Sequence, residues 1–355
     1  MGATLAATPY RRPELFDSLN TLDLIELSGS MAAAAGPLNL SQPTVSRRYQ
    51  KISKDFGLNK ASRRFLDDLH YGETTCIRLL RRACQSHRLE SGVLRIGSDP
   101  LRHGLMDGAS NVLPVPAQFR HARFLHRLVE CSILDGALLS SLEIEGLLPG
   151  RSQGPDPLGL GEPASGSVAA PPVATPQVDE SIAYQKAAKE WHGCLLVPLG
   201  CWQLGLVAAP DVDELPPRWS EVLVPPLAWA PGLASAVRQQ QWMVRQAPQA
   251  FYGSRSQQGL ASQQLPCIAT ASWFAALSCP PRGLRWLELP TPIREQIWLL
   301  VNPSTWEQYP TLAELAETIK TAIASFMRKT HTGIPKKGVN WCADKMRRKA
   351  SPQAA

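Results

Sequence analysis

The chain has 355 residues, of which 44% are hydrophobic, so it is too long for one ordinary domain and can bury more than one core. Its net charge of +7 is unevenly distributed: residues 1–92 carry 13 Lys or Arg against 9 Asp or Glu (+4), residues 93–327 carry 16 against 20 (−4), and residues 328–355 carry 8 against 1 (+7). Contact with a polyanion is therefore expected at the two ends and excluded for the acidic middle.

Neither an export signal nor a membrane span is predicted. Residues 1–12 lack an apolar core followed by a small-residue cleavage site. The most apolar stretch, 194–209, is interrupted by Pro198 and Gly200 and is shorter than the roughly 20 residues of a spanning helix, so it is interpreted as two buried strands around a turn. The eight cysteines form no CxxC pair and no zinc-ligand spacing, which favours reduced thiols and no metal site. We expect a soluble cytoplasmic protein without a membrane partner.

Two short helices are predicted near the N-terminus. Apolar residues at helical spacing indicate an amphipathic helix over 15–27, and Gly29 is suited to the left-handed turn that ends it. Ser30 is a good N-cap for a second helix over 31–35. The pair Gly36-Pro37 is expected to end this helix early.

A third helix is predicted over 42–56. Ser41 is its N-cap, Pro43 is tolerated in its first turn, and Gly57 ends it. One side of this helix is apolar and is expected to pack against the first two helices: Val45, Tyr49, Ile52 and Phe56.

The segment after the third helix is basic and is interpreted as a wing over 60–65. A longer connecting helix is then predicted over 72–89 and is expected to supply a dimer seam. Its candidate apolar stripe consists of Ile77, Leu80 and Cys84.

Alternating strands and helices predict an α/β body after residue 92. β-Branched and apolar runs indicate strands at 93–97, 194–199, 202–208, 285–289 and 296–301.

Three further segments complete the body and the C-terminus. A capping box at Thr311–Glu314 begins a final amphipathic helix that continues to Phe326. Residues 151–176 contain six prolines and four glycines and are predicted to form a flexible loop. The basic tail from residue 328 to 355 is predicted to be disordered.

The polar side of the third helix carries the candidate function. Gln42, Thr44 and Arg47 are placed near its N-terminus, where the second helix of a helix-turn-helix meets base edges in the major groove. Cationic residues further along this side are suited to hold phosphates, and two arginines lie in the predicted wing. The predicted DNA-contacting residues are Ser30, Ser41, Gln42, Pro43, Thr44, Ser46, Arg47, Arg48, Lys51, Lys54, Arg63 and Arg64.

The stretch from Gly29-Ser30-Met31 through Leu40–Arg47 to Phe56-Gly57 resembles the helix-turn-helix signature of LysR-type transcriptional regulators. The resemblance implies a promoter-binding homodimer or homotetramer whose body is a periplasmic-binding-protein-like pair of α/β subdomains with a small effector between them. The implied organisation is an arm over 1–13, a winged helix-turn-helix over 14–70, a linker helix over 71–91, an effector domain over 92–327 and the tail.

The chain departs from the family pattern at Gly36-Pro37 and Ser53, and it lacks the usual Leu-Phe-x-Arg after the third helix. Ser98 is the candidate effector contact, because it follows the first strand and leads toward a helix, where a hydroxyl and backbone amides suit an anion. A plain helix cap is the alternative for Ser98.

Two other classes of function stay open. An enzyme is not favoured, since no Walker loop, GxSxG or HExxH motif is present and no catalytic residue or cofactor is indicated. The alternative is a ligand- or partner-binding protein with a degenerate, weakly DNA-binding head.

Overall fold

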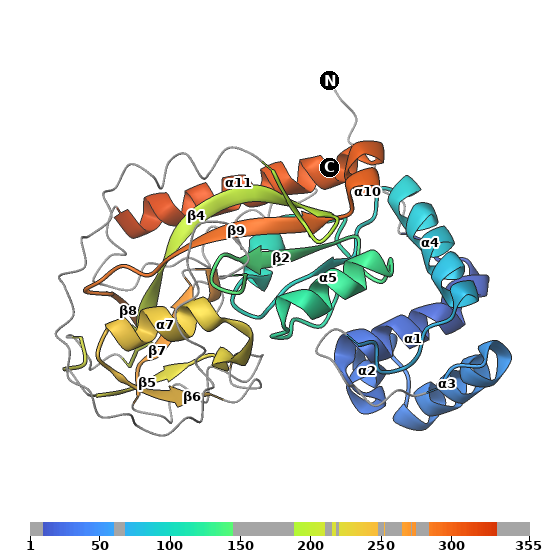
Figure 1. The fold of residues 1–355 in the computed structure, drawn as a ribbon, viewed down its shortest axis with the longest axis horizontal. Helices are drawn as coiled ribbons and strands as arrows, with labels where there is room; N and C mark the ends of the chain where they lie inside the picture. Colours follow the sequence, from blue (N-terminus) through green and yellow to red (C-terminus); the bar gives the residue numbers. More distant parts are fainter. Residues whose placement is uncertain are drawn as a thin grey trace, which may run out of the picture.

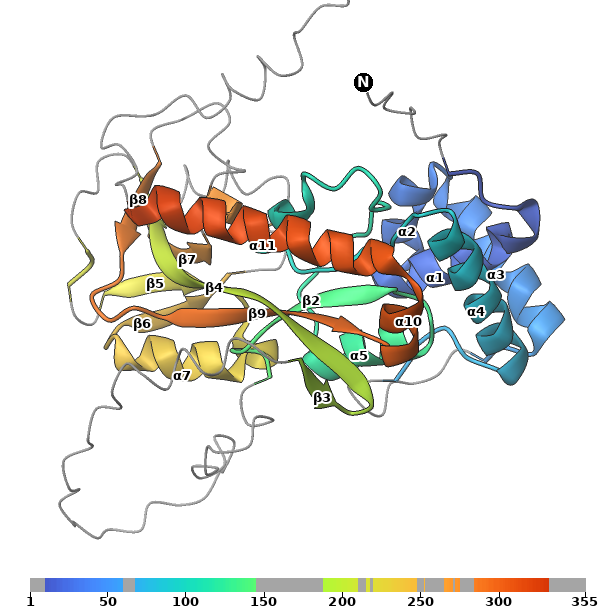
Figure 2. The same cartoon turned by 90° about the horizontal axis from the view of Figure 1, so that it is seen from above.

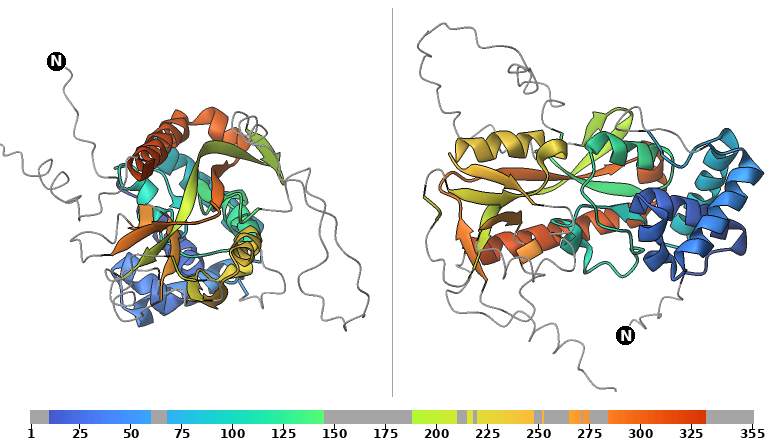
Figure 3. Two further views of the ribbon diagram at one scale, coloured as in Figure 1. Left: turned by 90° about the vertical axis from the view of Figure 1, so that its left-hand side faces the viewer. Right: turned by 90° about the horizontal axis from the view of Figure 1, so that it is seen from below.

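The computed structural model shows an elongated molecule with a helical head at one end and an α/β body at the other (Figure 1). The right-hand view of Figure 3 shows the same separation from below. The structure describes residues 10–59, 68–144, 188–209, 215–217, 220–247, 252, 265–270, 272–274 and 284–331.

Three helices form the head: α1 (Asp17–Ser28), α2 (Met31–Leu38) and α3 (Gln42–Phe56), preceded by the 3-10 turn Glu14–Phe16. Gly29 has φ 76° and ends α1 as predicted. Apolar side chains from all three helices meet in one core that includes Leu22, Ala34 and Val45. The predicted three-helix head is confirmed.

The predicted early end of the second helix is wrong. Pro37 lies inside α2, which continues to Leu38 and ends at Asn39, whose φ is 52°. The backbone N–H of Asn39 bonds the carbonyl groups of Ala35 and Gly36, so the last turn is closed even though Pro37 donates no hydrogen bond.

The linker helix α4 spans Thr75–Glu90, and the Thr74 hydroxyl accepts the N–H of Ile77 at 3.3 Å. The apolar stripe predicted for a dimer seam is used within the chain, because Ile77 and Cys84 are buried in the head core. Their position on α4 faces α1 rather than solvent. Leu79 lies on another side of α4 and is 62% exposed.

The body contains one mixed sheet in the order β1-β2-β9-β4-β7-β5-β6, with β3 and β8 also paired to β4. Its strands are β1 (Ile96–Gly97), β2 (Gly136–Ser140), β3 (Lys189–Trp191), β4 (Cys194–Ala208), β5 (Glu221–Val224), β6 (Met243–Gln246), β7 (Cys267–Thr270), β8 (Arg285–Glu288) and β9 (Arg294–Val301). The first strand is shorter than predicted, whereas the strands near 285 and 296 are confirmed. β4 pairs with β9 in one lobe and with β7 and β8 in the other, so it joins two lobes.

The prediction of two strands around a turn between 194 and 208 is wrong. β4 is one strand of 15 residues, and its register against β9 shifts only between Pro198 and Gly200. A bulge at this place lets the strand bend without a turn, and Ile323 approaches Gly200 so closely that a Cβ would lie 3.0 Å from it.

Helices cover both faces of the first lobe, in which β4 pairs with β9 (Figure 2). One face carries α11 (Pro310–His331), whose buried stripe includes Leu312, Ile319 and Ile323 as predicted. The other face carries α5 (Ala122–Glu130), and the second lobe carries α7 (Pro231–Gln239). A short helix, α10 (Pro303–Gln308), precedes α11. The all-α head and two-lobed α/β body confirm the predicted fold class.

Some predicted segments lie outside the described residues, namely the wing at 60–65, the loop at 151–176 and the tail from 332 onward. The first residues assigned to the tail are helical, since α11 continues to His331. Among the helices that the structure describes, none has the length and apolar character needed to cross a bilayer.

Candidate nucleic-acid interface

α3 is held firmly on its apolar side. Val45, Tyr49 and Ile52 are buried in the head core, and Phe56 is half-buried beside them. The Tyr49 hydroxyl donates to the Tyr71 carbonyl at 3.5 Å, and the two rings meet edge to face at 5.4 Å. These contacts fix the rotation of α3 about its axis, and therefore decide which side chains face solvent.

The opposite side of α3 is cationic. Arg47, Lys51 and Lys54 are exposed, and Arg48 is half-buried. Within the described part of the chain none of these four cations forms an ion pair. The outward cationic side predicted from the spacing is thus present, with its charges uncompensated.

The N-terminal turn of α3 is also open. Gln42 and Pro43 are exposed, and Thr44 and Ser46 are half-buried. Ser41 occupies the N-cap position, but its hydroxyl bonds the Thr44 hydroxyl at 2.9 Å instead of a backbone N–H. Its expected capping bond is therefore absent, and the Thr44 side chain is partly committed to Ser41.

Ser30 caps α2 as predicted, since its Oγ accepts the N–H of Ala33 at 3.1 Å. This bond fixes the start of α2, the helix that packs on α3. The remaining predicted DNA contacts, Arg63 and Arg64, lie outside the described residues.

α1 is buried on its polar side as well as its apolar side, which the sequence did not predict. Asp23 accepts from Arg81 of α4 at 2.8 Å and from Arg95, next to β1, at 3.3 Å. Arg95 also donates to the Asn20 amide oxygen at 2.7 Å. These groups are fully buried, so the head, linker helix and body meet in one ion-pair network.

A second buried pair anchors the linker helix to the body. Arg88 donates to both carboxylate oxygens of Asp135, at 3.0 and 2.6 Å. Asp135 also accepts the backbone N–H of Arg95 at 2.7 Å. Through Asp135, Arg88 of α4 is thus connected to the start of β1 and to the turn before β2.

Ser98, the predicted effector contact, is buried at the end of β1. Its hydroxyl lies 3.0 Å from His103 Nδ1, so a ligand there would have to displace His103. Ser98 is not the cap of the following turn, because Asp99 Oδ1 accepts the N–H of Arg102 at 2.9 Å.

A buried charge cluster lies beside Ser98. Arg102 pairs with Asp99, with Glu143 at 2.6 Å and with Glu295 at 3.1 Å. Ser140 donates to Glu295 at 2.6 Å. Three carboxylates around one guanidinium leave no surplus of positive charge for the anion that the sequence suggested.

Burial is the main cause of altered ionisation in this cluster. It raises the pKa of Glu143 to about 8, with a further contribution from the negative charge of Asp99. The pKa of Asp99 is also raised by burial and by Glu295. Glu143 is therefore harder to ionise than an exposed glutamate, because burial disfavours its charged form.

Sequence reasoning missed Arg102, Glu143 and Glu295 because they are 41 to 193 positions apart in the chain. The one available signal was Glu295, an acidic residue at the start of the apolar run 296–301. A carboxylate so close to a buried strand needs a cationic partner, but the pattern does not say which arginine supplies it.

Similarity to known proteins is found among solved structures alone. No protein-family model matches the chain, and no curated protein matches it. Among solved structures, it is similar to CbnR, a LysR family transcriptional regulator (12% identity, 87% of this chain and 99% of CbnR covered, TM-score 0.41), and to full-length CbnR complexed with its target DNA (13%, 86% and 99%, 0.41). It is also similar to full-length LysG from Corynebacterium glutamicum with bound effector Arg (16%, 87% and 97%, 0.35). These matches cover 97% to 99% of the solved chains.

Proposed function

We propose that the chain is a divergent LysR-type transcription regulator that binds promoter DNA through α3. One observation carries the proposal: α3 buries Val45, Tyr49 and Ile52 while Arg47 and Lys51 face solvent without ion-pair partners in the described part of the chain. A rigidly backed, cationic second helix of a helix-turn-helix has the shape and charge to enter a major groove.

The residues of α3 would have different roles in DNA recognition. Gln42 and Arg47 lie in the first two turns and are suited to pair with adenine and guanine edges. Lys51 and Lys54 lie further along and are suited to neutralise phosphates. The continuation of α2 through Pro37 to Leu38 supports a competent head, because the irregular sequence there leaves the helix pair intact.

Self-association is part of this proposal, since paired heads read paired half-sites. The exposed side of α4 around Leu79 replaces the predicted stripe as the seam, because Ile77 and Cys84 are occupied by the head core. Such a protein binds DNA in the cytoplasm and catalyses no reaction.

A small-molecule effector between the two lobes completes the proposal. Ser98 stays the proposed contact, next to the Arg102 cluster. The cluster favours a neutral or cationic ligand over an anion, because it holds more carboxylates than guanidinium groups.

The test is fluorescence anisotropy with labelled genomic fragments enriched by selection on the purified full chain. Affinity should fall steeply with salt, with a slope of about −0.9 per neutralised phosphate. Lys51→Ala should reduce that slope by about one per head and weaken all sequences alike, whereas Arg47→Ala should cost about 1–3 kcal/mol on the preferred site and relax its specificity.

Arg123→Ala is the matched control, since Arg123 is exposed on α5 in the body. It should leave affinity and slope unchanged. A flat salt response, or no binding at any salt concentration, would remove the regulator proposal and favour a degenerate head.

A further inference from the structure

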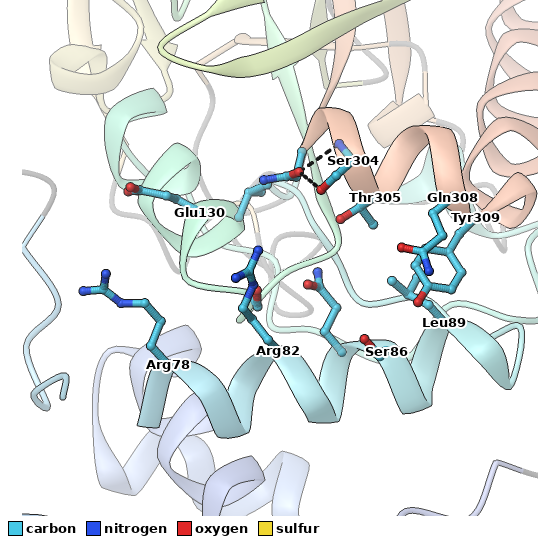
Figure 4. Close-up of a pocket in the computed structure, with 13 residues that line it drawn as sticks. Arg78, Arg82, Ser86, Leu89, Glu130, Ser304, Thr305, Gln308 and Tyr309 are labelled. Atoms are coloured by element: carbon cyan, nitrogen blue, oxygen red, sulfur yellow. Dashed lines mark hydrogen bonds between the residues drawn. The ribbon is translucent and has the colours of Figure 1, made fainter. Parts of the chain in front are cut away.

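A polar groove of about 170 Å³ lies between the linker helix and the body, away from the Arg102 cluster. Its walls are α4 on one side and α10 on the other, and the end of α5 closes it (Figure 4). The groove spans two parts with different roles, because α4 carries the head while α5 and α10 belong to the body. A molecule bound here would join them.

One cation in the groove is uncommitted. Arg78 pairs with Glu73, and Glu130 pairs with Arg127 at 2.6 Å, so these two charges are already compensated. Arg82 is exposed and has no hydrogen bond or ion pair among the described residues. Figure 4 shows its side chain rising from α4 into the space between α5 and α10.

The neutral groups around Arg82 are suited to complement an anion. The hydroxyls of Ser86, Thr305 and Tyr309 line the groove and make no hydrogen bond within the part of the chain that the structure describes. The amide oxygen of Asn302 accepts from Ser304, which leaves the Asn302 NH₂ group as a donor. A guanidinium with several free donors matches the oxygens of a carboxylate or phosphate.

The size of the groove limits the ligand. Its volume is below the roughly 300 Å³ at which pockets for drug-sized molecules begin. Leu89 and Val129 form a small apolar part of the lining, which gives room for a short carbon skeleton beside the charged group.

We propose that this groove binds a small carboxylate or phosphate anion through Arg82 and that the bound anion bridges α4 to α10. The site is separate from the proposed effector contact at Ser98 and does not depend on DNA binding. An anion held here links the head-bearing helix to the body, so it stiffens the connection between them.

The experiment is isothermal titration calorimetry of the full chain with inorganic phosphate and, separately, with succinate, at constant ionic strength in chloride. Saturable binding of either probe is expected, and comparison of the two identifies the preferred group. Arg82→Ala should weaken binding about tenfold or more, and Arg82→Lys should weaken it less because the charge is kept. Gln308→Trp, which fills the groove from α10, should also abolish binding.

Two controls separate this site from other cationic surfaces. Arg123→Ala removes an exposed arginine on α5 that does not line the groove, and Arg47→Ala with Lys51→Ala removes charge from α3. Both variants should bind the probes as the wild type does. The proposal is overturned if neither probe binds saturably up to roughly 10 mM, if Arg82→Ala binds normally, or if only the α3 variant loses binding.

Discussion

Asp23→Asn should destabilise the chain by about 3–5 kcal/mol, the usual cost of removing one partner from a buried ion pair. Asp23 is 2% exposed and is the one carboxylate that Arg81 and Arg95 share, at 2.8 and 3.3 Å. Arg95 would keep Asn20, whereas Arg81 would lose the one ion pair that it forms with described residues, and its Nη1 already lacks a partner among them. Most of the cost therefore arises at Arg81.

The assay uses urea unfolding followed by two signals. All ten tryptophans lie at position 191 or later, so tryptophan fluorescence reports the body, whereas far-UV circular dichroism also reports the helices of the head. In Asp23→Asn the dichroism should change at lower urea than the fluorescence, because the head loses its attachment first. In an Asp23→Asn background, Arg81→Met should cost less than it does in the wild type.

Asp17→Ala is the matched control on the same helix, because Asp17 pairs with Arg12 while about half exposed. It should cost no more than about 1 kcal/mol. The explanation is refuted if Asp23→Asn loses no more stability than Asp17→Ala, since that would mean that the buried network contributes nothing to the attachment of the head.

Three further outcomes are expected. Glu143→Gln should flatten the pH dependence of stability, because the native chain keeps the Glu143 proton up to a pKa of about 8 while the unfolded chain loses it near the ordinary pKa of 4.5. Wild-type stability should therefore fall with rising pH between these values, by up to about 1.4 kcal/mol per pH unit. If wild type and variant lose stability in parallel between pH 5 and pH 8 in urea unfolding, this explanation is wrong. Gly205→Ala should cost about 1–3 kcal/mol in urea unfolding, because its Cβ would overlap the Trp286 ring, and an unchanged midpoint would show that the ring moves freely. Leu79→Glu should lower the mass measured by light scattering if the exposed side of α4 is the dimer seam, whereas Leu15→Glu, at another exposed leucine, should not.

Local patterns predicted the head well because its helices are specified by nearby residues. Gly29 and Gly57 end α1 and α3 in left-handed conformations, and the i, i+4, i+7 spacing from Val45 to Ile52 determines which side of α3 is buried. The exposed cations of the candidate interface follow from that burial. The expected helix end before Pro37 is wrong because a helix tolerates a proline close to its C-terminal end, where the missing N–H breaks few helical hydrogen bonds.

Long-range contacts explain what the sequence could not predict. α1 has an apolar stripe, which indicates a helix with one solvated side, yet Asp23 is buried by Arg81 and Arg95 from later segments. The same applies to α4, whose apolar stripe is covered by its own head. A stripe shows that a helix is buried on one side, but it does not identify the partner that covers it.

The segment from Arg95 to Asp99 connects the two buried charge networks. Arg95 reaches Asp23 of the head, and four residues later Asp99 pairs with Arg102. The intervening β1 is hydrogen-bonded in register to β2. Asp135, just before β2, accepts from both Arg88 of α4 and the Arg95 backbone, which ties the linker helix to the same strand. Ion pairs and hydrogen bonds thus connect the Arg102 cluster, through the segment from Arg95 to Asp99, with α1, against which α3 is packed.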